Sequence, residues 1–131
     1  MIETESFRHA AVFSSLLILL MAGLGTNVSL IRLRRKIFVG DGGDKHLPKA
    51  IRAHGNSAEH VPLLLVLLVL LGMLDAGATG VMVVGALSLL SRCLHAGGRL
   101  GNKRLFSTTG ATLTYYLELG MGIWVLWLVT G

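Results

Sequence analysis

The sequence predicts an all-α membrane protein, built as a bundle of four transmembrane helices. Apolar residues make up 53% of the 131-residue chain and charged residues only 15%, against about a quarter in soluble domains. The mean hydropathy is +0.69. Leu, Val and Ala dominate, which favours helices over strands. Eleven of the twelve Lys and Arg lie in two clusters, 32–52 and 92–104, a pattern typical of cytoplasmic loops between membrane helices.

The chain alternates between four helical stretches and three short connections. The first apolar run, 10–31, is long enough to cross about 30 Å of hydrocarbon at roughly 1.5 Å per residue. Glycine-rich sequence at 40–43 marks a turn after it. Because the connections are short, neighbouring helices should be antiparallel. We predict one domain over 1–131, with helices at about 7–36, 47–74, 78–97 and 105–130.

The charge distribution predicts the orientation of these helices. The two basic clusters should lie in the cytoplasm, which places both termini on the opposite side of the membrane. The net charge of +5 is therefore interpreted as a topology signal, and not as a surface for nucleic acid. A single cysteine, Cys93, excludes an intrachain disulfide and a cysteine-based metal site.

The candidate functional site begins with a polar stripe on the second predicted helix. Arg52, Asn56 and Glu59 stand at i, i+4 and i+7, so they share one helix face. Glu59 should lie about 10 Å deeper in the membrane than Arg52, directly before a long apolar run. Arg92 on the third helix should lie at a similar depth. Arg32 or Arg34 from the first helix and Arg104 from the fourth should approach the same half of the bundle.

Several of these residues also have a simpler interpretation. The cations of the loops are expected as solvated topology signals or partners of lipid headgroups, and Arg52 fits that role too. Glu59 and Arg92 could form a purely structural ion pair, since a carboxylate in a membrane helix usually pairs with a cation. His54 and His60 do not share the stripe cleanly. Without an HExxH motif or a clear second ligand set, we expect no metal site.

Glu118 forms a separate problem in the fourth helix. It lies 14 residues beyond Arg104, or about 21 Å deeper, and so should not reach the arginines. Thr114 and Tyr115 are its neighbours on the same helix, and Ser14 or Ser15 should lie at its depth. We favour a hydrogen-bonded structural carboxyl, because the sequence shows no relay partners for a proton pathway.

The chemistry of the stripe predicts a small anionic ligand. Arginines offer paired donors to carboxylates or phosphates, Glu59 accepts from an ammonium, and Asn56 matches an amide. Glutathione carries all of these groups. A phospholipid headgroup fits in part, and side-chain chemistry alone leaves both open.

The pattern Arg52-x-x-x-Asn56-x-x-Glu59-x-x-Pro62 on a second membrane helix resembles the signature of the MAPEG superfamily, the membrane-associated proteins in eicosanoid and glutathione metabolism. The sequences at 40–43 and 50–56 look most like its small bacterial members. The resemblance implies a homotrimer, in a bacterial inner membrane, with glutathione bound between neighbouring subunits. It implies that Arg52, Asn56, Glu59 and Arg92 bind glutathione, with help from Arg34 or Arg32.

The resemblance also implies a reaction. Arg104 matches the family arginine held to stabilise the glutathione thiolate, which would attack an apolar electrophile or a lipid hydroperoxide arriving from the bilayer. Where the mammalian synthases carry tyrosines after the helix-three arginine, this chain has His95 and Arg99; His95 could replace one polar contact. Three hypotheses follow: a glutathione transferase or peroxidase, a non-catalytic protein binding glutathione or anionic lipid through the same arginines, and a small transport or scaffold protein.

Overall fold

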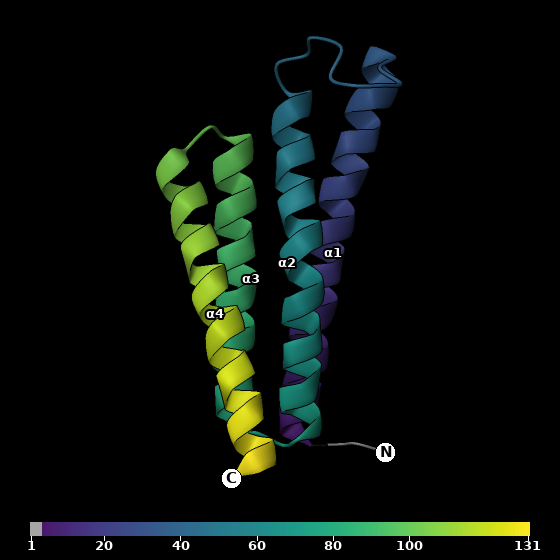
Figure 1. Ribbon diagram of the computed structural model, residues 1–131. Coiled ribbons are helices and arrows are strands. Elements are labelled where there is room, and N and C mark those ends of the chain that lie inside the picture. The colour runs from purple at the N-terminus through teal and green to yellow at the C-terminus, as the bar shows by residue number, and fades with distance from the viewer. Residues whose placement is uncertain (1–3) are drawn as a thin grey trace.

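Four long helices account for nearly all of the residues that the structure describes, 4–131 of the chain, in a computed structural model (Figure 1). Each observed bound lies within about one helical turn of the predicted one. The bounds are α1 Glu5–Arg35, α2 Leu47–Met73, α3 Ala78–Leu100 and α4 Arg104–Thr130. The prediction of an all-α bundle of four apolar helices is therefore confirmed.

Local sequence explains where the first two helices begin and end. The Thr4 side chain accepts a hydrogen bond from the backbone N–H of Phe7 and so caps α1, which satisfies one of its free N–H groups. Lys36 ends α1 in the left-handed conformation. Pro48 lies in the first turn of α2, where its missing N–H costs nothing. The Asp44 carboxylate accepts from the backbone N–H groups of His46 and Leu47 at the start of that helix.

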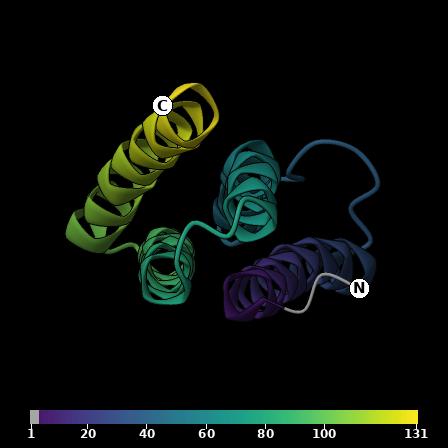
Figure 2. The ribbon, with the colours of Figure 1, turned by 90° about the horizontal axis from the view of Figure 1, so that it is seen from below.

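The helices form two antiparallel hairpins packed side by side. One hairpin is α1 with α2 and the other is α3 with α4. Helices α2 and α3 lie between the outer helices, and α1 and α4 do not touch each other (Figure 2). Both termini lie at the same end of the bundle, and the α1–α2 hairpin extends farther than α3–α4 at the opposite end (Figure 1). That opposite end carries both basic clusters.

The core between the hairpins is apolar in one half of the bundle. Its fully buried members come from all four helices and include Leu17, Leu64, Val81 and Met121. Toward the basic end the contacts become polar, and small residues let α3 and α4 approach closely. A Cβ on Gly110 would lie 2.5 Å from the backbone of His95 and Ser91. Close backbone approach of this kind is a common way to pack membrane helices.

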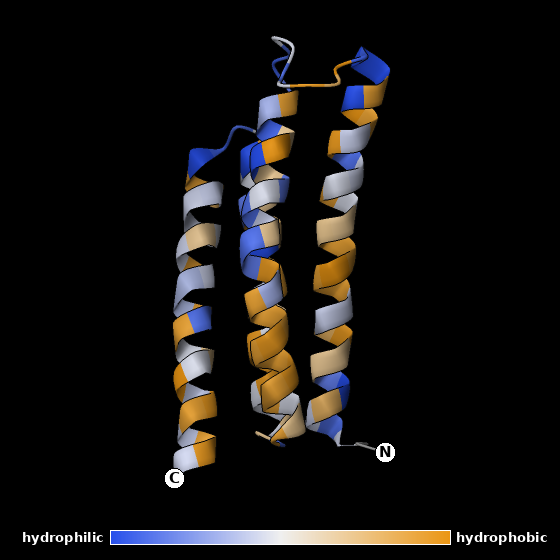
Figure 3. Ribbon diagram, turned by 45° about the vertical axis from the view of Figure 1, so that its right-hand side comes forward, coloured by the Kyte–Doolittle hydropathy of each residue, from blue (hydrophilic) through white to orange (hydrophobic). Residues whose placement is uncertain are grey.

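All four helices have the length and composition to cross a membrane, with 31, 27, 23 and 27 residues. Large apolar side chains are exposed along their outer faces, among them Leu19, Leu63, Leu119 and Ile123. Hydrophobic residues dominate the half of the bundle farther from the basic end, and hydrophilic residues gather toward the basic end (Figure 3). An exposed surface this apolar fits a lipid environment, where every backbone polar group must be bonded within the helix.

Candidate functional site

Arg92 forms the centre of a buried polar junction between α2, α3 and α4. Its side chain is 0% exposed. One guanidinium nitrogen, Nη2, donates to Oδ1 of Asn56 at 2.7 Å and to Oγ of Ser57 at 3.3 Å. The other, Nη1, donates to Oγ1 of Thr114 at 3.1 Å. The Thr114 hydroxyl in turn lies within hydrogen-bond distance of two acceptors for its single proton, the carbonyl oxygen of Gly110 at 2.9 Å and Oγ of Ser91 at 3.1 Å. The junction therefore ties the Asn56 amide to the other hairpin in a fixed orientation.

The other two residues of the predicted stripe face outward from the subunit. Arg52 and Glu59 are exposed, whereas Asn56 is half-buried between them. The simpler alternative of a structural ion pair between Glu59 and Arg92 is not what the subunit shows. Arg92 bonds Asn56, and neither residue belongs to an ion pair within the described chain. The exposed Glu59 carboxylate and Arg52 guanidinium therefore flank the Asn56 amide, which Arg92 holds from inside the bundle.

Two further predicted residues meet at the basic end of the α3–α4 hairpin. His95 and Arg104 line one cavity of about 480 Å³, together with Arg99, Ser107 and four other residues. The Nδ1 atom of His95 lies 3.0 Å from the carbonyl oxygen of Ser107, so this nitrogen carries the proton and donates. The cavity has two arginines and no carboxylate in its lining, which suits an anion.

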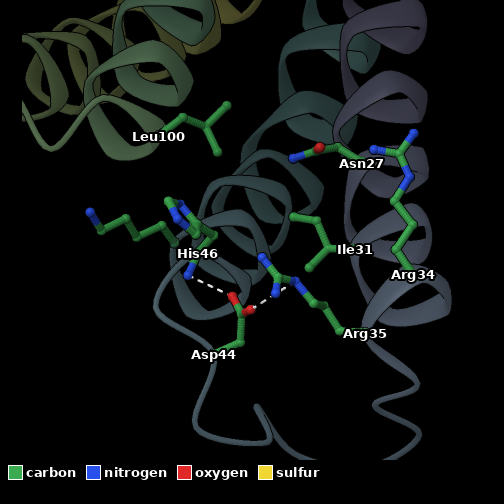
Figure 4. Close-up of a pocket in the computed structure, with 8 residues that line it drawn as sticks. Asn27, Ile31, Arg34, Arg35, Asp44, His46 and Leu100 are labelled. Atoms are coloured by element: carbon green, nitrogen blue, oxygen red, sulfur yellow. Dashed lines mark hydrogen bonds and ion pairs between the residues drawn. The ribbon is translucent and has the colours of Figure 1, made fainter.

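Arg34 lies elsewhere, in a cavity of about 390 Å³ beside the end of α1 (Figure 4). Arg32 turns back to its own loop, where Nη1 donates to the carbonyl oxygens of Gly40 at 2.9 Å and Ile37 at 3.4 Å. Within one subunit the structure therefore brings Asn56 to Arg92 and His95 to Arg104. It leaves Arg34 in a separate cavity, and Arg52 and Glu59 on the outer surface.

Sequence reasoning missed a second polar junction one helical turn away from Arg92. The Nδ1 atom of His60 lies 2.8 Å from Oε1 of Glu118, and both side chains are largely buried. Tyr115 packs edge-on against the His60 ring, with centroids 5.0 Å apart. Glu118 thus has a hydrogen-bond partner, as expected, but it is a histidine of α2 and not a serine of α1. The spacing from Asn56 to His60, and from Thr114 to Glu118, is i, i+4 in both cases, and this was the signal that both lie on the junction's face.

Among residues 4–131 the structure contains no group of three His, Cys, Asp or Glu side chains arranged to hold a metal ion. The polar junctions consist of one guanidinium, one amide, hydroxyls and a histidine–carboxylate pair, which bond one another within the subunit.

Comparison with known proteins places this architecture in a family. The family model described as "MAPEG family" matches residues 10–127. The inner membrane protein YecN of Escherichia coli K12 is 32% identical over 120 residues, which cover 90% of each chain. YecN of Escherichia coli O6:H1, strain CFT073, matches to the same extent. With four helices able to span a bilayer, these matches indicate an integral inner membrane protein. The chain belongs to the MAPEG family.

Proposed function

We propose that this protein is a membrane glutathione-dependent transferase or peroxidase that acts as a homotrimer. The observation that carries the proposal is the α2 stripe, where Arg52 and Glu59 are exposed on either side of Asn56. Charged groups on a membrane helix are costly unless they face an interior or a polar ligand. A neighbouring subunit covering this stripe, with glutathione between the two, removes that cost.

The groups on the stripe match glutathione one by one. Glu59 accepts from the ligand's ammonium, Arg52 donates to a carboxylate, and Asn56 hydrogen-bonds a peptide amide. Arg92 has its three acceptors within its own subunit and no exposed surface. We therefore assign it a positioning role: it holds the amide of Asn56, and does not contact glutathione itself.

Arg104 supplies the chemistry in this proposal. A free thiol has a pKa near 8.5, and a nearby cation lowers it. Arg104 stays protonated and favours the thiolate electrostatically, while the thiol proton passes to water. With an apolar electrophile, a carbon–sulfur bond forms as the leaving group departs. With a lipid hydroperoxide, a sulfur–oxygen bond forms as the O–O bond breaks, and the departing alkoxide takes a proton from water. His95, in the same cavity as Arg104, supplies a further polar contact to glutathione. Arg34 lies in its separate cavity and is left out of this proposal.

The alternative function is binding without catalysis. The cavity of His95 and Arg104 carries Arg99 as an additional cation, so glutathione or an anionic lipid could bind there through its carboxylates or phosphate alone. In that case the thiol would keep its proton. The two functions differ in one measurable quantity, the amount of thiolate formed per bound glutathione.

The test uses the full-length protein purified in detergent. Glutathione is titrated while binding, thiolate absorbance and conjugation to an aryl halide are recorded. Glu59→Gln should weaken binding by roughly tenfold or more because it loses a charge-assisted hydrogen bond. Arg104→Ala should bind but lose most of the thiolate signal. Glu5→Gln and Arg8→Ala, at the opposite end of α1, are the matched controls.

The outcomes separate the hypotheses. A parent protein that shows neither binding nor thiolate rules out glutathione chemistry. Binding without thiolate supports the non-catalytic alternative. Unchanged binding in Glu59→Gln, with an intact oligomer, would remove the α2 stripe from the site.

A further inference from the structure

The far end of the α1–α2 hairpin carries a cationic cavity that the proposed glutathione chemistry does not require. Arg34 and Arg35 reach it from α1, and Lys49 from α2. The cavity measures about 390 Å³ and also contains the side chains of His46, Asn27, Ile31 and Leu100. Its lining therefore combines three permanent cations with apolar groups, as Figure 4 shows for the labelled residues.

The one carboxylate in this cavity is already occupied. Oδ1 of Asp44 accepts from the backbone N–H groups of His46 at 2.7 Å and Leu47 at 2.9 Å. Its Oδ2 lies 3.5 Å from Nε of Arg35. The hydrogen bonds from Leu47 and His46 hold the pKa of Asp44 below its usual range, so it stays ionised at neutral pH. After this pairing the lining keeps an excess of positive charge, which favours an anionic ligand.

The loop beside this cavity presents two large apolar side chains to the outside. Phe38 is 90% exposed and Val39 is 88% exposed. Part of the α1–α2 loop is coloured hydrophobic next to the hydrophilic helix ends in Figure 3. Side chains of this kind favour the boundary between headgroups and acyl chains over water.

The fold of the loop holds these two side chains outward. Arg32 binds the carbonyl oxygens of Ile37 and Gly40, on either side of the exposed pair. The Ile37 side chain packs against Gly42, where a Cβ would lie only 2.9 Å away. Phe38 and Val39 thus occupy the outer side of a loop that is closed by its own contacts.

The length of α1 brings this loop to the level of lipid headgroups. Its 31 residues span about 46 Å at 1.5 Å per residue, whereas the hydrocarbon core is about 30 Å thick and the whole bilayer about 40–45 Å. The end of α1 therefore lies where phospholipid phosphates lie. Phosphates there would meet the cations, and the acyl chains would meet Ile31, Leu100 and the exposed loop residues.

We propose that this end of the α1–α2 hairpin binds an anionic phospholipid. The lipid phosphate occupies the cavity of Arg34, Arg35 and Lys49, and Phe38 and Val39 insert beside it into the bilayer surface. The protein would then select anionic lipids around one edge of its bundle, independently of any glutathione bound at the α2 stripe.

Calorimetric titration of the full-length protein in an uncharged detergent tests this proposal. Short-chain phosphatidylglycerol should bind more tightly than phosphatidylcholine with the same chains. The double variant Arg34→Gln, Lys49→Gln should lose roughly 30-fold in affinity for phosphatidylglycerol, from two juxtamembrane cations. The variant Lys36→Gln, Lys45→Gln carries the same charge change on exposed residues of the same hairpin outside the cavity lining, and it should keep nearly the parent affinity. Phe38→Ser, Val39→Ser should weaken both lipids alike.

Four results would overturn the proposal. Equal binding of the two lipids would show that the net negative charge of the lipid does not contribute to binding. An equal loss in the Lys36→Gln, Lys45→Gln control would show a general charge effect. Displacement of the lipid by inorganic phosphate at the same concentration would indicate a site for free phosphate. Displacement by glutathione would make the cavity part of the glutathione site. The circular dichroism of each variant verifies that it is folded, and the lipid comparison on the parent protein stands without any variant.

Discussion

Arg92 illustrates how a full charge is accommodated inside an apolar bundle. Its guanidinium has three oxygen acceptors from α2 and α4 and no exposed surface. Hydrogen bonds to a charged group contribute about 1.5–3 kcal/mol each, which offsets part of the desolvation cost. The carboxylate one helical turn away, Glu118, is bound to His60 instead. A charged residue is therefore used here to orient an amide, while Glu59 remains open to a ligand.

At this scale, Asp44 gives a prediction about pH. Its pKa is lowered because the ionised form accepts hydrogen bonds from the N–H groups of Leu47 and His46. A carboxyl with a lowered pKa stabilises the folded state above its unfolded pKa, and this contribution disappears as the pH falls through the lower, folded value. The protection factor for hydrogen exchange in the first turn of α2, which is corrected for the intrinsic exchange rate, should fall over that acidic range. Asp44→Ala should show low protection at every pH, whereas Asp41→Ala, whose carboxylate accepts only from Gly43, should behave like the parent.

Sequence reasoning located Arg92 in depth but did not give the direction in which the α2 side chains point. The 1.5 Å rise per residue put Arg92 at the level of Glu59, and in the structure Arg92 bonds Asn56 and Ser57, within one turn of that residue. The same rise wrongly put Glu118 out of reach of the arginines, since Glu118 lies one turn from Thr114, which bonds Arg92. The rise gave no information on whether Glu59 or Asn56 would face α3, because that depends on the rotation of α2 about its axis. His60 was passed over for the same reason. One turn below Asn56 on a helix whose inner face was unknown, it had no identifiable partner until α4 was placed.

The contact between α3 and α4 depends on glycine where the two backbones approach. Gly110 lies against the backbone of Ser91 and His95, and Gly98 against that of Ser107. Helix boundaries here were predictable from apolar runs and basic loops, since these are local features. The seam, meaning this close contact between the α3 and α4 backbones, was not predictable. Glycines also occur at positions with open space around them, such as Gly120 and Gly122.

Gly110→Ala tests this seam. The added methyl group would lie 2.5 Å from backbone atoms, which cannot move aside as side chains do. Overpacking of this kind costs about 1–3 kcal/mol, and the midpoint of thermal unfolding in detergent should fall. Gly120→Ala on the same helix should be neutral or should gain up to about 1 kcal/mol from helix propensity. Equal midpoints for the two variants would show that the seam relaxes without cost.

For the whole molecule, the exposed charges of α2 predict self-association. A monomer would leave Glu59 facing lipid next to an apolar run, a state that membrane proteins avoid. Native mass spectrometry of the detergent-solubilised protein should therefore give a mass of three chains. Glu59→Leu removes the charge without adding bulk to the polar junction, so it should retain the trimer while losing glutathione. A parent protein that remains monomeric at every concentration would contradict the proposed arrangement of the site.

The bond between His60 and Glu118 has a consequence for how the molecule assembles. It joins residues 58 apart in sequence, one in each hairpin, so it forms only when the hairpins meet. Before that, a hairpin that has entered the bilayer alone keeps an imidazole or a carboxyl in hydrocarbon without its partner. Lipid gives helices no hydrophobic reason to associate; two unsatisfied polar groups do. The same pair favours one alignment of the two hairpins along the bundle axis, because sliding one hairpin by a turn would separate the two side chains. It would thus act late in biogenesis, as both an attraction and a check on alignment.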